Sequence, residues 1–365
     1  MTQKTTSKIS IPTGIIFKNS GRQPELDIAR GLAVIFMVLI HTCEYYWDYE
    51  NVVFDKIANF LGSPPSAPVF MFLLGCGIVY SRKSDPKTLC KRGLKMLFLS
   101  YIFNALVYVL PYGIYSLIHK DPSLFADSWT QIYDVDILQF AALAFLFFAI
   151  TGIFKLNAWL IAIIAAAISG IGIILNIAVP EIENNVLQAI TGLFIGSHEG
   201  SYFPFSSWIL YPAAGYLFAT YLKNTENKKK FYTKVSLIGG AVYLILTFVI
   251  LKFHEWDNLM DGEIYYHQGL PINIMFLGFV LFWLGLCYAL YHILPKKIIK
   301  FLETCSINVT PMYVCQYILI IYMVILPFGE EASFNTPITI AIFVVYTIGS
   351  YFMSIVYKNY KKRFK

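Results

Sequence analysis

The sequence predicts an all-α polytopic membrane protein with about ten transmembrane helices. Of its 365 residues, 57% are hydrophobic and only 14% are charged, whereas a soluble globular protein carries about 25% charged residues. The apolar residues also form long runs, and roughly 20 such residues cross the hydrocarbon core of a bilayer as one helix. The segments between these runs are alternately rich and poor in basic residues. These three observations indicate one helical membrane domain and no separate soluble domain.

The apolar runs divide the chain into ten predicted spans. We place them at residues 28–45, 66–81, 94–117, 137–154, 158–178, 205–222, 235–251, 271–294, 307–328 and 337–357. They leave an N-terminal arm at 1–27 and a basic tail at 358–365, on either side of a transmembrane domain at 28–357. Because the arm is polar and no small-residue cleavage site follows the first run, we do not expect a secretory signal.

The charge of the loops predicts the orientation of the chain. The arm, the tail, every second loop and the span ends beside them hold 25 of the 28 Lys and Arg, and only Lys56, Lys120 and Lys252 fall on the other side. That other side holds 17 of the 22 Asp and Glu. Since basic loops remain in the cytoplasm, we expect both termini there. A missed or extra span would disrupt this alternation.

Several function classes are not expected. The Lys-rich segment 228–230 is explained as a topology signal, so no nucleic-acid partner is predicted. The six cysteines form no C-x-x-C pair and are interpreted as small buried hydrophobic residues. His254, Glu255 and His267 lack a convincing ligand spacing, and we predict no metal site.

Ionisable residues in the first span are the first indication of function. Arg30 and His41 are 11 residues apart, which is three helical turns and roughly 16 Å along the axis. Asp27 and Glu44 fall on the same stripe. Ionisable groups inside a span are costly and indicate a functional site. One face of this helix therefore carries an arginine near the cytoplasm and a histidine toward the outer leaflet.

These residue types suit a reaction across the membrane. An arginine binds phosphate through two parallel hydrogen bonds, and a histidine takes a proton from a hydroxyl or amine near neutral pH. Glu44, one turn beyond His41, would fix its tautomer or raise its basicity. Alternatively, Arg30 extends to the headgroups and His41 is a hydrogen-bonded packing residue.

Five segments together resemble the membrane-bound acyltransferase 3 superfamily, closest to its heparan-α-glucosaminide N-acetyltransferase-like branch. They are 26–33 followed by His41, 67–75, 91–94, 136–139 and 305–313, in the family's order. The resemblance implies transfer of an acyl group, usually acetyl from acetyl-CoA, to a hydroxyl or amine, commonly of a sugar. Gln316 stands where many relatives carry a histidine, which indicates a different substrate.

The resemblance also assigns roles to residues. His41 is expected to be catalytic, as general base or, alternatively, as a residue that is itself acylated. Arg30 and Arg92, with Lys91 and Asp27 beside them, are expected to form the acyl-CoA site. Independently of the resemblance, the position of the long outer loop 252–270 suits a cover over the acceptor site.

Two further polar groups are candidates for the acceptor site or the acyl tunnel. Asp134, Asp136 and Gln139 lie at the outer end of the fourth predicted span, and the alternative is that they are solvated loop ends. Asn308, Tyr313 and Gln316 form a stripe in the ninth, and the alternative is that they hold helices together.

The sequence therefore predicts a membrane acyltransferase with acyl-CoA and a carbohydrate-like acceptor as its partners. The alternative is a proton-coupled transporter or a lipid or glycan flippase that uses the same Arg, His and Glu. Carriers often consist of two similar halves, and this sequence shows no internal repeat. The frequent Lys, Asn and Ile suggest a bacterial plasma membrane.

Overall fold

A computed structural model describes residues 19–120, 122–179, 185–196, 200–260, 262–329 and 332–363. Over these residues the chain is helical and contains no strand, only two isolated bridges between loops. The all-α fold predicted from the sequence is therefore confirmed.

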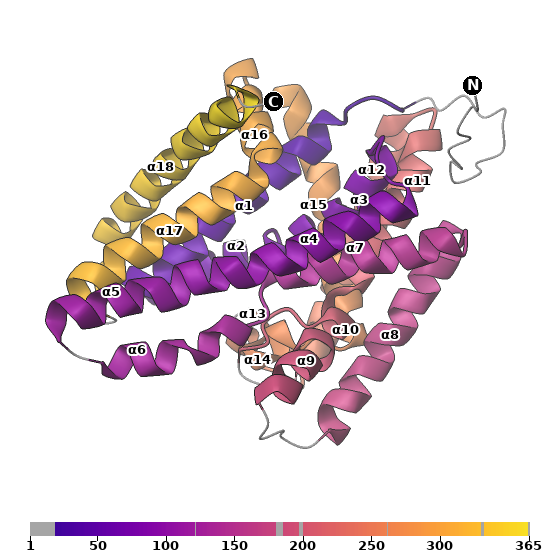
Figure 1. Cartoon of the computed structure of the whole chain (residues 1–365). Helices are drawn as coiled ribbons and strands as arrows, with labels where there is room; N and C mark the ends of the chain where they lie inside the picture. The colour runs from indigo at the N-terminus through magenta and orange to yellow at the C-terminus, as the bar shows by residue number, and fades with distance from the viewer. Residues whose placement is uncertain are drawn as a thin grey trace, which may run out of the picture.

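The helices form a bundle in which they are tilted relative to one another (Figure 1). In chain order they are α1 (Pro24–Tyr46), α2 (Val52–Gly62), α3 (Ala67–Tyr80), α4 (Pro86–Asn104), η1 (Ala105–Val109), α5 (Leu110–His119), α6 (Ser123–Ser128), η2 (Thr130–Tyr133), α7 (Ile137–Ile153), α8 (Ala158–Ala178), α9 (Asn185–Ile195), α10 (Phe205–Trp208), α11 (Leu210–Asn224), α12 (Lys228–Ile250), α13 (Trp256–Met260), α14 (Glu263–Tyr266), α15 (Leu270–Ile293), α16 (Lys296–Ile307), α17 (Val309–Phe328) and α18 (Thr336–Arg363).

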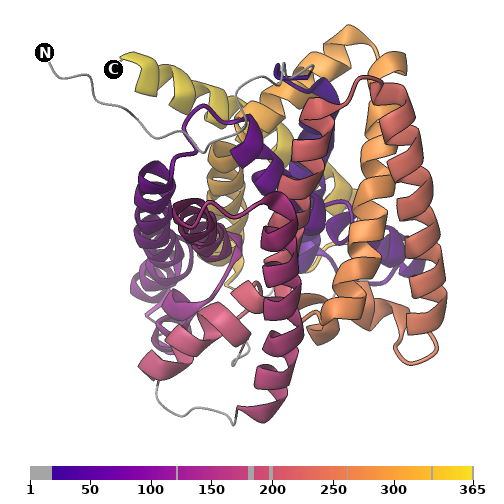
Figure 2. The same ribbon diagram turned by 90° about the vertical axis from the view of Figure 1, so that its right-hand side faces the viewer.

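Helix α1 lies at the centre of the bundle. It packs against α2, α3, α15, α16, α17 and α18, and most of its side chains are buried. The pair α12 and α15 packs on one flank (Figure 2), and the apolar faces of α8 and α12 that point outward remain exposed. Asp27 is therefore enclosed by protein, and Arg30 and His41 are partly buried, as expected for polar residues of a membrane helix.

Each of the ten predicted spans coincides with helix. Eight helical segments are long and apolar enough to cross a membrane, among the described residues. The predicted span 137–154 is α7, which has 17 residues. The span 205–222 is divided into α10 and α11 at Ile209. Pro212 lacks the backbone N–H that would bond to Trp208, which explains the break there.

A widened turn interrupts the third predicted span. The π-helix η1 joins α4 to α5 and is followed by Pro111. A proline cannot donate to the carbonyl four residues earlier, and single π turns inside α-helices often mark functional sites. This turn carries Tyr108, which lines a cavity described below.

Two glycines let α3 and α11 approach each other closely. A Cβ atom at Gly75 would overlap the carbonyl of Pro212, and one at Gly215 would overlap the carbonyl of Phe72. Small residues at such crossings are the usual means of packing membrane helices. α3 also packs against α1 and contributes lining residues to both cavities described below.

The segments predicted to be cytoplasmic lie together at one end of the bundle. The backbone of Asn19 donates to the carbonyl of Lys223, and Lys228 pairs with the buried Glu25 at 2.5 Å. The start of α1 and the end of α18 lie at this end (Figure 1), as the expected orientation requires. The connection between the predicted spans 271–294 and 307–328 is itself a helix, α16, whose apolar face, including Leu302, packs against α1.

The loops at the opposite end also contact one another. Trp47 pairs with Phe334 and Val135 with Ser201 through isolated bridges. The predicted outer loop 252–270 contains α13 and α14, and its Tyr265 hydroxyl donates to the carbonyl of Ser63 at 3.4 Å. These contacts form a cover over the outer end of α1.

Candidate active site

His41 is held between α1 and α17. Its Nδ1 lies 3.2 Å from Nε2 of Gln316, and its Nε2 lies 3.2 Å from the hydroxyl of Tyr317. Both partners come from one turn of α17, which packs directly on α1. The His41 ring is therefore fixed at both nitrogens.

The amide of Gln316 can support either tautomer of His41. The Gln316 side chain is completely buried, and its Oε1 has no hydrogen-bond partner. An amide can donate through nitrogen or, turned over, accept through oxygen. In the second arrangement Oε1 would accept from Nδ1–H, and the unprotonated Nε2 of His41, beside the Tyr317 hydroxyl, would carry the electron pair required of a base.

Asp136 caps α7 and also contacts α17. Its Oδ1 accepts from the backbone N–H of Ile137 at 2.6 Å, and its Oδ2 accepts from the hydroxyl of Tyr313. Gln139 completes a capping box by accepting from the backbone N–H of Asp136 at 3.2 Å. The cap fixes the Asp136 carboxylate at the outer end of α7.

Burial changes the acidity of the carboxyl groups beside this cap. It raises the pKa of Asp134 to about 7, and the neighbouring Asp136 carboxylate adds to the increase. Burial also raises the pKa of Asp136, opposed by the hydrogen bonds from Tyr313 and the Ile137 backbone. Like charges and desolvation both disfavour the ionised form. The acidic groups at this end of α7 therefore change charge closer to neutral pH than free carboxyls do.

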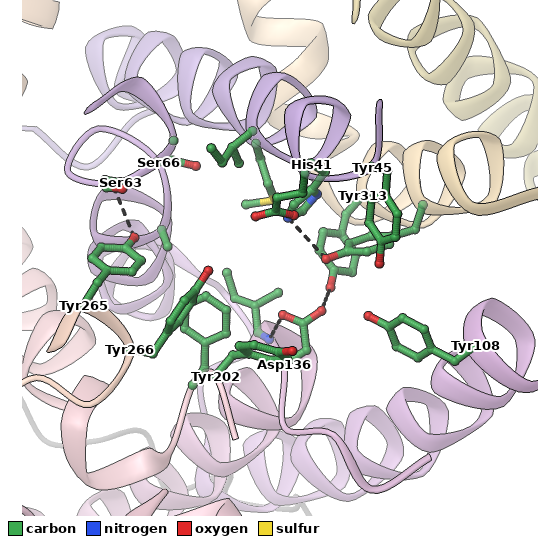
Figure 3. A pocket seen from close by; sticks show the side chains of 18 residues that line it. His41, Tyr45, Ser63, Ser66, Tyr108, Asp136, Tyr202, Tyr265, Tyr266 and Tyr313 are labelled. Carbon is green, nitrogen blue, oxygen red and sulfur yellow. Dashed lines mark hydrogen bonds between the residues drawn. The ribbon is translucent and has the colours of Figure 1, made fainter. Parts of the chain in front are cut away.

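An outer cavity of about 290 Å³ opens beside His41. Figure 3 shows the labelled side chains surrounding an open centre, with His41 facing Asp136, Tyr202 and Tyr266 across it. Glu44, Tyr313 and Tyr317 also line it. His41 thus faces a space large enough for part of a small acceptor.

A second, inner cavity of about 270 Å³ lies toward the predicted cytoplasmic end and is lined by Arg30 and Arg92. The two cavities share one lining residue, Ile137, which is buried between them. The guanidinium of Arg92 lies 4.5 Å from the centre of the Phe145 ring, a cation–π contact. Arg30 and His41, on one helix, therefore open into different cavities on either side of Ile137.

Arg30 is oriented by a small polar network. It donates to the hydroxyl of Ser306 at 3.3 Å and to the carbonyl of Leu73 at 3.2 Å. Ser306 donates to Asp27 at 2.6 Å, and Asp27 lies 3.8 Å from Arg30 and also pairs with Arg22. Asp27 is thus a counter-ion that positions the arginine. A carboxylate would repel the phosphates of a donor, so a direct contact from Asp27 is not supported by its position.

Three other predicted site residues, Lys91, Gln139 and Asn308, do not line either of the two cavities. Lys91 lines a separate exposed groove beside Lys87 and Lys95, away from Arg30. Gln139 uses its amide in the cap and donates to the carbonyl of Asp134 at 3.0 Å. Asn308, at the junction of α16 and α17, lines neither cavity. The structure therefore assigns Gln139 to helix capping.

A comparison with families of known proteins matches an acyltransferase domain over residues 23–357. The chain belongs to the acyltransferase 3 family. The match covers both cavities and every predicted span, and it shows that this membrane protein is an acyltransferase of that family. A comparison with curated proteins finds no match.

Several residues of this acyltransferase site have little or no local signal in the sequence. Tyr317 contacts His41 directly, yet it lies in an apolar run where its spacing of four from Tyr313 was the only signal. Ser306, which bonds Arg30, lies near the end of α16, in the segment between two predicted spans. Tyr108, Tyr202 and Tyr266 come from a π turn and from outer loops, whose folding over α1 has no local sequence signature.

Proposed function

We propose that this protein transfers an acyl group, acetyl in the simplest case, from cytoplasmic acyl-CoA to a hydroxyl or amine of an extracytoplasmic acceptor, with a saccharide as the favoured acceptor. One observation carries the proposal. Arg30 and His41 lie on the same helix and open into separate cavities that share Ile137. A donor held at the inner cavity and an acceptor held at the outer one would meet at this residue.

The inner cavity suits the phosphates of the donor. Arg30 and Arg92 are the two cationic side chains that line it among the described residues, and guanidinium groups bind phosphate well. His41 lies roughly 16 Å farther along α1, which suits an extended pantetheine arm. The thioester would then reach Ile137 while the nucleotide remains at the cytoplasmic end.

His41 is proposed to act as the general base. As the acceptor oxygen or nitrogen attacks the thioester carbonyl, His41 takes its proton, and collapse of the tetrahedral intermediate breaks the carbon–sulfur bond. The protonated His41 then gives this proton to the departing CoA thiolate, so the products are the acylated acceptor and free CoA, and the base is regenerated. The two hydrogen bonds to His41 keep its ring in position for this step.

Two finer assignments follow from the sequence motifs. Among acyltransferase 3 proteins we place this chain nearest to the heparan-α-glucosaminide N-acetyltransferase-like branch, on the five segments described above. Its composition and the basic loops of one side suit the plasma membrane of a bacterium, with the donor in the cytoplasm.

The test is calorimetric titration of acetyl-CoA into purified protein. We expect binding that Arg30→Ala and Arg92→Ala each weaken by about tenfold or more, because each removes a charge-assisted contact to phosphate. Lys91→Ala is the matched control, since it removes one positive charge outside the inner cavity and is expected to leave binding unchanged. If the folded protein bound neither acetyl-CoA nor longer acyl-CoA molecules, the proposal would fail, and a carrier would become the better account.

A further inference from the structure

The outer cavity has an unusual set of polar side chains. Seven tyrosines line it, from α1, η1, α14, α17 and the segment before α10. Its charged residues are Glu44 and Asp136, and no lysine or arginine lines it among the described residues. A ligand inside therefore meets aromatic faces, hydroxyl groups and carboxylates, and no cation that would compensate a negative charge.

The tyrosines are arranged as a platform. The rings of Tyr202 and Tyr266 lie 5.2 Å apart and nearly perpendicular, and Tyr265 and Tyr266 pack in the same manner at 5.1 Å. Across the cavity, Tyr313 and Tyr317 pack at 5.1 Å. Each ring offers an apolar face together with a hydroxyl that donates and accepts hydrogen bonds. Such a surface matches a sugar ring, which has apolar C–H faces and hydroxyl groups at its edge.

The carboxylates complement hydroxyl groups and oppose anions. A carboxylate is an acceptor only, so Glu44 and Asp136 would accept hydrogen bonds from sugar hydroxyls. In a partly enclosed cavity, repulsion between like charges is far stronger than in open water. An anionic group placed here would be desolvated without a cationic partner, which is costly.

The outer loops around the cavity are predominantly acidic, like the two carboxylates inside it. Of the 28 Lys and Arg in the chain, only Lys56, Lys120 and Lys252 are on the predicted outer side, together with 17 of the 22 Asp and Glu. Fields of one sign around a cleft attract ligands of opposite charge and repel ligands of the same charge. The outer loops thus add to the effect of the two carboxylates inside.

We infer that the acceptor unit entering the outer cavity is a saccharide without acidic groups, either neutral or carrying an amine, and that Glu44 and Asp136 exclude saccharides that carry carboxylate, sulfate or phosphate groups at that unit. This inference rests on the proposed function, since it names the acceptor class for the same site. It makes the two carboxylates determinants of acceptor specificity in addition to any part they have in positioning His41 or α7.

The experiment measures binding of two trisaccharides with the same β-1,4 backbone to the full chain in lipid nanodiscs. Cellotriose is neutral, and cellotriuronic acid carries a carboxylate on each ring. We expect cellotriuronic acid to bind at least about tenfold more weakly than cellotriose at low salt, and this ratio to shrink as salt screens the charges.

The variant Glu44→Gln/Asp136→Asn is expected to reduce the ratio of the affinities for cellotriose and cellotriuronic acid to about threefold or less, since both carboxylates are replaced by neutral amides. Asparagine at position 136 retains the helix cap. The matched control Asp48→Asn/Glu50→Gln removes one Asp and one Glu on the same side outside the cavity lining, and it should retain the wild-type ratio.

The inference would be overturned if the wild-type protein bound the acidic trisaccharide as tightly as the neutral one, or more tightly. It would also be overturned if Glu44→Gln/Asp136→Asn kept the wild-type ratio of the two affinities. Binding of neither sugar would overturn the assignment of the cavity to saccharides. The acetyl-CoA titration measures the donor site separately, so failure of this inference is distinguishable from failure of the proposed transfer reaction.

Discussion

The hydroxyl of Tyr317 lies 3.2 Å from Nε2 of His41, and the two rings are 4.5 Å apart between centroids. Tyr317 also packs edge-on against Tyr313, whose hydroxyl donates to Asp136. α17 therefore connects the histidine of α1 to the carboxylate that caps α7. The site joins three helices that are far apart in the sequence.

Replacement of His41 tests the base directly. We expect His41→Ala to reduce acyl transfer by about 10²–10⁴-fold, the usual contribution of a general base. Binding of acetyl-CoA should remain, because Arg30 and Arg92 line the other cavity. Radiolabelled transfer and calorimetry on the same preparation check both outcomes, and a fully active His41→Ala protein would contradict the mechanism.

Gln316 is expected to act as a positioning residue. Gln316→Leu removes the contact to Nδ1 of His41 and should lower kcat by about 10–100-fold, by analogy with the loss of partners that orient metal-binding histidines. KM for acetyl-CoA should change little, and the pH profile of kcat should shift because His41 loses a hydrogen bond. If kcat and thermal stability both fell while the pH profile of kcat stayed unchanged, Gln316 would have a purely structural role.

The sequence was informative where the determinants are local. Unbroken apolar runs predicted the helices, and the spacing of Arg30 and His41 predicted that both lie on one face of α1. What it did not predict depends on packing between distant segments. Ser306 reaches Arg30 only because α16 packs on α1, and Tyr266 reaches the cavity only because α14 folds over its outer end. Pro212 was present in the predicted sixth span, and its missing N–H signals the break between α10 and α11.

Asp134 should make stability depend on pH. Its pKa is raised to about 7 in the folded chain from a usual value near 3.8, so the folded state binds more protons than the unfolded state between these values. The contribution of Asp134 therefore favours folding at acid pH, and it is lost as pH rises from about 4 to 7. Asp134→Asn should flatten this part of the curve of thermal midpoint against pH.

Asp85, at the opposite end of the bundle from Asp134, offers a control for that measurement. It caps α4 at the predicted cytoplasmic end, and its hydrogen bonds to Thr88 lower its pKa. Asp85→Asn keeps a cap residue and should leave the slope between pH 5 and 7 unchanged. A wild-type curve that rises over this interval and is unaffected by Asp134→Asn would show that Asp134 ionises freely.

Ile137 is expected to limit the length of the acyl group. It is the residue shared by the two cavities, so the acyl end of a donor that reaches His41 must pass beside it. The series Ile137→Val and Ile137→Ala should progressively raise kcat/KM for butyryl-CoA relative to acetyl-CoA, by about 10-fold or more in the alanine variant, since each methylene in a tight pocket is worth about 1–3 kcal/mol.

Leu138→Ala is the control for this series. Leu138 lines the inner cavity but not the outer one, so its truncation should alter donor binding without changing the preference for acyl length. Ile137→Ala is expected to cost about 2–5 kcal/mol of stability as a buried truncation, and the milder Ile137→Val keeps the comparison meaningful if the alanine variant unfolds. An unchanged ratio of butyryl to acetyl transfer in both Ile137 variants would show that the acyl group reaches His41 by another route.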